Sequence, residues 1–390
     1  MKNFDNTRLA FHDKTTSQLI RARWLFRLIA NPFLVKIGSA FTRMAIKAGI
    51  PVEWALKPTV FSHFCGGETI EKCETVIQKL GESNIKTILD YSAEGKESDP
   101  DFDFTASQIL ATINKTKTSQ NIPYAVFKPS GVARVSLLEK IQAGKILTEE
   151  ENNEYERALA RFRLIGQTAF QLGVPVMIDA EESWIQRIVD EITEEMMLSF
   201  NQEKPIVFAT LQLYRTDRLE YLKSLFERLR QKGVYPGVKL VRGAYMEKER
   251  ERAIQNGYPS PIYPDKPSTD KAFDEAVAFC LEHVDEMAVC IGTHNELSCA
   301  LASEKIISMG IDRAHPNISF SQLLGMSDNI SYLLAVDGFR VTKYVPFGPL
   351  KTVVPYLIRR AEENTSVAGQ TSRELSLIET ELRRRKAGKA

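Results

Sequence analysis

From about residue 85 onward, short apolar runs alternate with longer amphipathic stretches along the chain. The apolar runs have the length of buried strands and lie at 87–91, 124–127, 174–179, 206–211, 237–241, 287–291, 318–320 and 339–345. Most of the stretches between and after them have helical spacing, at 106–115, 155–172, 184–200, 219–231, 270–283, 297–309 and 350–363. This alternation is typical of a parallel sheet with crossover helices.

Eight strands in one chain are the number found in a (β/α)8 barrel, so we expect this α/β fold with an N-terminal helical extension. A doubly wound sheet has the same alternation. Such a sheet usually carries its cofactor on a glycine-rich first turn, and the pattern G-x-G-x-x-G is absent from this sequence. We therefore predict a helical N-terminal region at 1–84, a barrel domain at 85–365 and a basic C-terminal tail at 366–390.

The composition argues against several classes of protein. Hydrophobic residues make up 43% of the chain, charged residues make up 26%, and the net charge is +1, which gives no reason to expect binding to nucleic acid. No apolar run is long enough to span a bilayer, and early charged residues interrupt any secretory signal. The 5 cysteines are widely spaced, so we expect reduced thiols and a cytoplasmic location.

One segment is biased in charge. Between Lys14 and Val52 there is no acidic residue, whereas lysines and arginines alternate with large apolar side chains. Such a basic amphipathic segment suits the surface of an anionic membrane. A helix pair that packs on the main domain and exposes a basic face explains the same pattern. The sequence leaves both interpretations open.

Polar side chains stand at the ends of most of the predicted strands, where a barrel carries its chemistry. They are Lys128, Asp179, Gln212, Arg242, Thr293, His294, Asn295, Gln322 and Tyr344. Each alone has an ordinary explanation: Lys128 as a surface lysine, Asp179 as a helix cap, His294 as a core histidine. No second histidine stands at metal-ligand spacing from His294, so we expect no metal. Taken together, these strand ends predict an enzyme.

The last predicted helix carries two adjacent arginines. Tyr356 and Arg360 are four residues apart, as are Arg359 and Glu363, so each pair shares a helix face. A solvated helix with internal ion pairs explains this spacing. However, apolar residues flank the arginines, and two guanidiniums near the mouth of a barrel suit the binding of a small carboxylate.

These segments resemble the proline dehydrogenase family. The matching motifs are VMIDAE at 176–181, KLVRGAY at 239–245, GTHN at 292–295, SFSQLLGM at 319–326, YVPFG at 344–348 and YLIRRAEEN at 356–364. Their order and spacing agree with the family from about Phe61 to Ser366. The chain is most similar to the single-function enzymes related to the mitochondrial type.

The resemblance implies FAD and L-proline, with hydride transfer from C5 of proline to N5 of the flavin. It implies that Arg359 and Arg360 hold the proline carboxylate, that Lys128, Asp179, Tyr344 and Glu363 surround the reacting centre, and that Leu323, Tyr344 and Tyr356 pack around the ring. It implies flavin contacts at Gln212, Lys239, Val241, Arg242, Gly243, Ala244, Tyr245, Lys266, Thr269, Thr293, His294, Asn295, Arg360 and Glu363. Glu94 matches an acidic gate residue that pairs with an arginine.

The resemblance also implies a quinone as electron acceptor and transfer of the product to a pyrroline-5-carboxylate dehydrogenase. It implies that residues 14–52 contact an inner membrane peripherally, which in a eukaryote would be the matrix side of the mitochondrial inner membrane. The resemblance further implies a preference for proline over hydroxyproline, because the hydroxyproline-preferring relatives tend to carry a smaller residue where this chain has Tyr344. Two rival hypotheses remain at this stage. One is a Schiff-base lyase using Lys128 or Lys239, and the other is a non-catalytic adaptor on a barrel scaffold.

Overall fold

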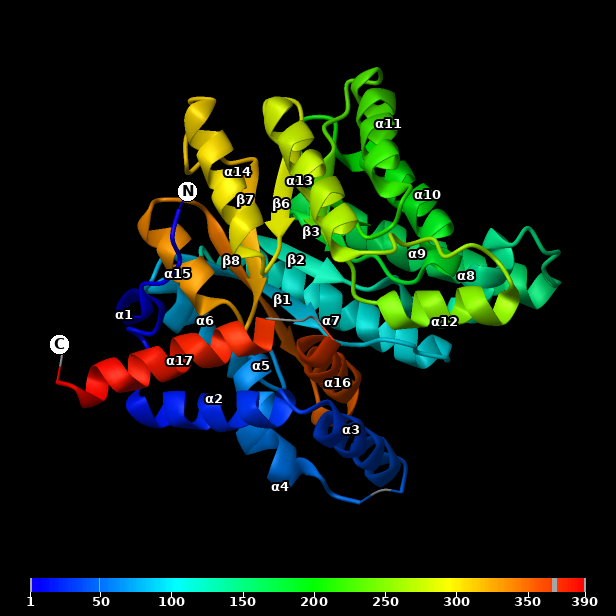
Figure 1. Ribbon diagram of the computed structural model, residues 1–390. Helices are drawn as coiled ribbons and strands as arrows, with labels where there is room; N and C mark the ends of the chain where they lie inside the picture. The colour runs from blue at the N-terminus through cyan, green and yellow to red at the C-terminus, as the bar shows by residue number, and fades with distance from the viewer. Residues whose placement is uncertain (1, 49, 367–369, 389–390) are drawn as a thin grey trace.

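The structure is a computed structural model that describes residues 2–48, 50–366 and 370–388. Eight parallel strands form a closed barrel in the order β1 to β8 (Figure 1). They are β1 (Ile85–Tyr91), β2 (Tyr124–Phe127), β3 (Val176–Ile178), β4 (Val207–Gln212), β5 (Gly237–Val241), β6 (Ala288–Gly292), β7 (Ile318–Leu323) and β8 (Val341–Phe347). Pairing between β1 and β8 closes the sheet. The predicted barrel is confirmed.

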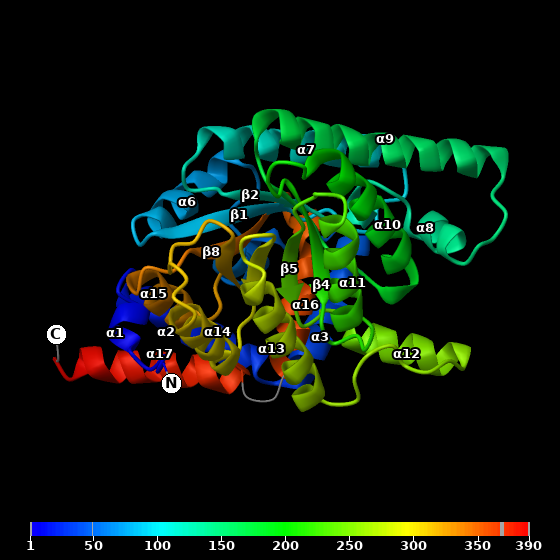
Figure 2. The same cartoon turned by 90° about the horizontal axis from the view of Figure 1, so that it is seen from above.

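Helices surround the barrel on the outside (Figure 2). They are α7 (Asp99–Thr118), α8 (Val135–Gln142), α9 (Glu149–Leu172), α10 (Ser183–Phe200), α11 (Arg218–Arg230), α12 (Met246–Asn256), α13 (Lys266–Glu282), α14 (Glu296–Ser308) and α15 (Asp328–Val336). Helix α16 (Leu350–Ser366) follows β8 and packs against α2 (Thr16–Ile29) and α3 (Pro32–Lys47). The sequence did not predict the short helices α8, α12 and α15. Strand β3 is shorter than the predicted run 174–179 at both ends, although Pro175 and Asp179 still form backbone hydrogen bonds with β2.

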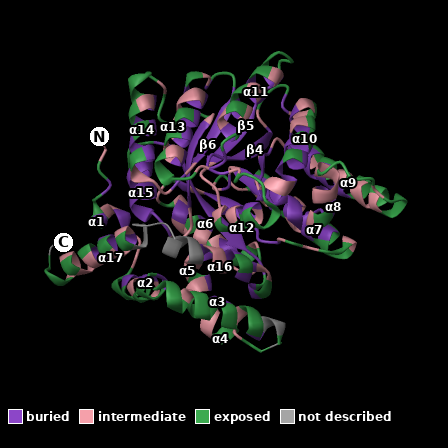
Figure 3. Ribbon diagram, turned by 45° about the vertical axis from the view of Figure 1, so that its right-hand side comes forward, coloured by how far each residue is buried: buried purple, intermediate pink, exposed green. Residues whose placement is uncertain are grey.

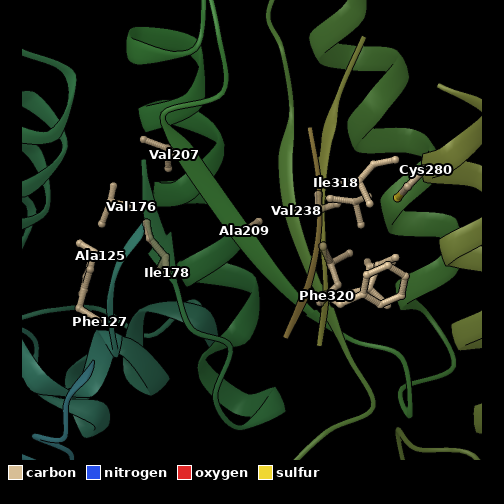
Figure 4. Packing of buried hydrophobic residues seen from close by; sticks show 14 of the residues in the cluster. Ala125, Phe127, Val176, Ile178, Val207, Ala209, Val238, Cys280, Ile318 and Phe320 are labelled. Atoms are coloured by element: carbon tan, nitrogen blue, oxygen red, sulfur yellow. The ribbon is translucent and has the colours of Figure 1, made fainter. Parts of the chain in front are cut away.

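Alternate side chains of each strand point in opposite directions. The outward set, which includes Ala125, Phe127, Val176, Ile178 and Phe320, packs against the surrounding helices in the largest hydrophobic cluster (Figure 4). The inward set fills the barrel with a smaller cluster of Ile88, Tyr124, Val126, Met177, Phe208, Ala288, Cys290 and Tyr344. Filling the interior in this way makes the barrel a packed core rather than a pore. Its carboxyl-end face opens into a cavity lined by many polar residues.

The chain begins with helices α1 (Thr7–Ala10), α2 (Thr16–Ile29), α3 (Pro32–Lys47), α4 (Glu53–Leu56), α5 (Ser62–Phe64) and α6 (Glu74–Gly81), and it ends with α17 (Gln370–Lys386). Helix α2 starts at a capping box formed by Thr15 and Gln18. Helices α2 and α17 lie side by side, so the two ends of the chain meet (Figure 1). Leu19 and Phe26 of α2 share a cluster with Leu377 and Ile378 of α17.

The basic segment has one packed face and one open face. Leu19, Ala22, Phe26 and Ile29 are buried, as the packed-helix interpretation requires. Yet large apolar side chains of α2 to α4 are exposed (Figure 3). They include Trp24 at 58%, Phe33 at 69%, Phe41 at 55% and Trp54 at 79%. In the described part of the chain, no helix combines the length and the hydropathy needed to cross a membrane.

Candidate active site

A cavity of about 520 Å³ opens at the carboxyl ends of the barrel strands, a size within the range of small-molecule sites. Most of the predicted site residues line it: Lys128, Asp179, Gln212, Lys239, Val241, Arg242, Gly243, Ala244, Tyr245, Lys266, Thr293, His294, Asn295, Leu323, Tyr344, Tyr356, Arg359 and Arg360. Glu94 lies behind this wall and pairs with Arg359. Thr269 is buried in α13 away from the lining. Glu363 belongs to α16, but its side chain lies outside the described residues.

Two lysines and two aspartates form a buried ionic cluster at the base of the cavity. The Lys128 ammonium donates to Asp90 Oδ2 at 3.0 Å, to Asp179 Oδ2 at 3.3 Å and to the Tyr344 hydroxyl at 2.9 Å. The Tyr344 hydroxyl donates to Asp179 Oδ2 at 2.8 Å, and Lys239 donates to the other oxygen of Asp179. Burying these charges is tolerable because each faces an opposite charge and is hydrogen-bonded.

The cluster fixes the charge of its members. Burial would raise the pKa of Asp179, but Lys239 and Lys128 lower it to about 2. Burial would likewise lower the pKa of Lys128, yet Asp90 and Asp179 raise it above its ordinary value. The pKa of Tyr344 is raised by burial and by Asp179, so its hydroxyl keeps its proton. Near neutral pH the base of the cavity therefore holds fixed ammonium, carboxylate and phenol groups.

The arginines of α16 line another part of the cavity wall. Arg359 donates through both terminal nitrogens to the carboxylate of Glu94. Its guanidinium also lies 5.7 Å from the centre of the Tyr245 ring. Arg360 is 8% exposed and lies 5.2 Å from the centre of the Tyr356 ring. The structure thus brings the two arginines predicted from α16 to the same cavity as Lys128 and Asp179.

Polar groups from β5, β6 and α13 line a second end of the cavity. Arg242 donates to Asp270 at 2.7 Å, to Thr293 at 2.6 Å and to Ser298 at 2.9 Å, which fixes its guanidinium. Nδ1 of His294 lies 2.9 Å from the Ser327 hydroxyl. Burial lowers the pKa of His294 to about 3, and Lys343 and Arg360 add to the effect, so this ring is neutral.

Gly243 has a φ of +141°, which L-residues with a side chain rarely adopt. A Cβ at this position would lie 2.5 Å from the Tyr214 ring. The resemblance implies a flavin contact at this glycine. In the structure, the tyrosine behind it and the backbone conformation already exclude a side chain.

Comparison with known proteins decides the family. The family model described as proline dehydrogenase matches residues 73–373. The chain belongs to the proline dehydrogenase family. It is 35% identical over 329 residues to the carbapenem antibiotics biosynthesis protein CarD of Pectobacterium carotovorum, covering 84% of this chain and 85% of that protein. It is 31% identical to the mitochondrial proline dehydrogenase 1 of Dictyostelium discoideum, covering 98% of this chain and 75% of the relative.

Solved structures agree on the fold of this proline dehydrogenase family member. Proline utilization A from Bdellovibrio bacteriovorus superimposes with a TM-score of 0.73 at 19% identity, covering 92% of this chain. This chain spans 38% of that protein. At this identity the likeness shows the barrel and its helices alone.

Several residues of the cavity and of the buried cluster at its base were not predicted from the sequence. Asp90 lies inside the run that predicted β1, where an apolar pattern hides a single carboxylate. Thr210 faces the cavity from β4, and its buried hydroxyl has no hydrogen-bond partner among the described residues. Arg373 and Glu374 reach the cavity from α17, in the tail that carries no barrel pattern. Only the alternation of inward-facing and outward-facing side chains along β1 and β4 could have indicated Asp90 and Thr210.

Proposed function

We propose that this protein catalyses FAD-dependent oxidation of L-proline to 1-pyrroline-5-carboxylate, the first step of proline catabolism. The observation that carries the proposal is one cavity that faces both the arginine pair of α16 and the buried Lys128–Asp179–Tyr344 cluster. The family supplies the reaction class. The finer assignment of residues to substrate and cofactor is our own.

The residues of the cavity fit a flavin dinucleotide. Arg242 and Lys266 supply positive charge for two phosphates, and Lys239 would place a cation near the flavin ring. The unpartnered Thr210 hydroxyl offers a donor to a ligand. The backbone from Val241 to Tyr245, together with Gln212, Thr293, His294 and Asn295, would hold the cofactor. Gln212 accepts from the Ala244 backbone N–H at 3.1 Å, which shapes this turn. When bound, the flavin supplies the acceptor for the hydride that leaves C5 of proline.

The chain's own groups bind and orient the substrate. Arg360, with Arg359 beside it, pairs with the proline carboxylate, as planar guanidiniums do. Tyr344, Tyr356 and Leu323 pack on the ring and exclude water from it. Fixing the carboxylate and the ring orients C5 toward the cofactor side of the cavity. Orientation of this kind lowers a barrier by several kcal/mol.

The amine of proline must lose its proton before hydride leaves. Asp179, with its pKa near 2, is a poor base, and Lys128 keeps its own proton. In our proposal these groups act by charge. The cations of Lys128, Lys239, Arg359 and Arg360 disfavour the protonated amine of the substrate, and its proton leaves to water. Glu363 stays a predicted member of this surround.

Anaerobic titration with L-proline tests the function. The purified protein should carry a flavin spectrum that bleaches on adding proline, with weaker bleaching by hydroxyproline, the substrate named for a Xenopus laevis relative that is 29% identical. A colourless protein that borohydride traps with a keto acid would instead support a lyase. The ion-paired Lys128 and Lys239 argue against that outcome, because a lyase needs a neutral amine. A protein without flavin or proline-dependent dye reduction would support the adaptor hypothesis.

We propose a membrane quinone as the electron acceptor and direct passage of product to a pyrroline-5-carboxylate dehydrogenase. The exposed apolar side chains of α2 to α4, among basic residues, support contact with an anionic membrane surface. Flotation of the holoprotein with liposomes, with and without anionic lipid, tests this contact. Phe33→Ser/Phe41→Ser should lose binding, whereas Ile254→Ser, a change at an exposed apolar residue of α12, should keep it. Equal flotation of all variants would contradict the contact.

A further inference from the structure

The loops that follow β1 and β2 pack tightly against each other beside the cavity. Gly131 in the second loop has no room for a side chain, because a Cβ there would lie 2.8 Å from the carbonyl oxygen of Ala93 and 3.1 Å from Thr105 Cγ2. Ala93 immediately precedes Glu94, which pairs with Arg359 at the cavity wall. The position of Glu94 therefore depends on what holds these two loops together.

Ser130 supplies that connection through two hydrogen bonds. Its hydroxyl accepts from the backbone N–H of Gly95 at 3.3 Å. Its carbonyl oxygen accepts from the backbone N–H of Lys96 at 3.2 Å. Both donors directly follow Glu94 in sequence. Ser130 is 2% exposed, so water does not compete for these bonds.

Glu181 fixes Ser130 in turn. Its two carboxylate oxygens accept from the Ser130 hydroxyl at 2.6 Å and from the Ser130 backbone N–H at 2.7 Å. Glu181 itself is held by its backbone, which donates to Gln186 at 3.0 Å and accepts from the Gln212 amide at 2.7 Å. The ends of β3 and β4 thus anchor the loop after β2, and that loop anchors the loop after β1.

We propose that Ser130 and Glu181 are positioning residues that set the place of Glu94 and, through it, the guanidinium of Arg359 at the cavity. Neither residue lines the cavity. Glu181 holds Ser130, and Ser130 holds the backbone of Gly95. Gly95 follows Glu94, which pairs with Arg359. The inference rests on the proposed function only in assigning Arg359 to the substrate carboxylate. The hydrogen bonds that hold the two loops together do not depend on the identity of the substrate.

A double-mutant cycle in the holoenzyme tests the connection. Ser130→Ala should raise KM for proline about fivefold, the effect of one net hydrogen bond, and change kcat less than about twofold. In the Glu94→Gln background the same substitution should have no further effect on KM, because residues acting through one contact are not additive. Independent, multiplicative effects would overturn the proposal. So would a fall in kcat alone, which would place the action at the neighbouring Lys128.

A matched control removes a different buried hydroxyl. Ser303 is 2% exposed and donates to the Ala300 carbonyl at 2.8 Å on the outer helix α14. Ser303→Ala should leave KM unchanged. Should Ser130→Ala fail to fold, Glu181→Gln weakens the same anchor with little change in volume and takes its place in the cycle with Glu94→Gln.

Hydrogen–deuterium exchange separates this proposal from the proposed function, because it needs no turnover. Backbone amides of residues 93–97 should exchange at least threefold faster in Ser130→Ala than in the unchanged protein and in Ser303→Ala. Unchanged exchange would refute the anchor even in an active enzyme. Faster exchange in a protein that does not oxidise proline would keep the anchor and reject the reaction.

Discussion

The cavity has two buried carboxyl groups of opposite character. Asp179, at the base, is surrounded by Lys128 and Lys239, and its pKa falls to about 2. Glu374, which reaches the rim from α17, accepts from the Ser327 backbone N–H, and burial raises its pKa to about 7. Asp328 raises the pKa of Glu374 further and Lys343 opposes this, but no ammonium or guanidinium group forms a described hydrogen bond with its carboxyl group. Both groups are buried, but Asp179 stays ionised because two ammonium groups contact it. Glu374, which has no such described contact, changes its protonation near neutral pH.

The difference separates two tasks within one cavity. The base presents charges that stay constant over the physiological range, so their effect on the substrate amine does not vary with pH. The rim combines a neutral histidine with a carboxyl group poised near neutrality, and both groups contact Ser327. The following substitutions test whether this division holds.

The largest effect should come from Arg360, which lines the cavity from α16. Arg360→Ala should weaken proline binding by about 100-fold to 1,000-fold, because it removes a buried charge partner of the substrate. The flavin should remain bound. Rapid-reaction measurements of the reductive half-reaction, at increasing proline, give the affinity. Arg383→Ala, at an exposed arginine of α17, is the control. Normal proline affinity in Arg360→Ala would show that Arg360 does not bind the substrate carboxylate.

Asp179→Asn should destabilise the fold by about 3 kcal/mol or more, because it leaves two buried lysines with too little compensating charge. Urea unfolding at pH 7 measures this free energy. Asp103→Asn, which removes a carboxylate that is 67% exposed and pairs with Arg161, should cost less than about 1 kcal/mol. Equal costs for the two substitutions would show that burial does not distinguish them.

Glu374→Gln should change how stability depends on pH. The folded-state pKa of Glu374 is raised from 4.5 to about 7, so its contribution is fully present below 4.5 and is lost as the pH rises through 7. The stability of Glu374→Gln relative to the unchanged protein should therefore increase by up to about 3 kcal/mol between pH 4.5 and pH 7. Parallel stability curves would contradict the raised pKa. The sign is opposite for Asp179, whose contribution is lost as the pH falls from 3.8 toward 2.

The smallest effect should come from His294. Its pKa of about 3 keeps the ring neutral above pH 4. His294→Asn should lower activity through the lost contact with Ser327, while the apparent pKa values of kcat/KM between pH 6 and pH 9 shift by less than about 0.2 unit. A missing ionisation in the variant would make His294 a titrating group and break the comparison.

The sequence predicted those parts of the molecule that follow a local pattern. Strands β2 and β5 begin and end at the predicted residues, because turn residues bound their apolar runs on both sides. The arginines of α16 and Lys128 could be placed because strand order in a barrel brings distant loops to one face. Asp90 and Glu374 could not, since their roles arise from contacts between segments far apart in sequence. Pairing of Ser130 with Glu181 likewise has no local signature.

The side-by-side arrangement of α2 and α17 has a consequence for biosynthesis. Because Arg373 and Glu374 lie on α17 and line the cavity, its wall remains incomplete until α17 has left the ribosome and packed against α2. A nascent barrel can therefore close its sheet before its ligand site exists. Loading of any ligand that needs the rim must wait until α17 has packed in place, and a truncation at residue 366 should leave the cavity open on the side of α17.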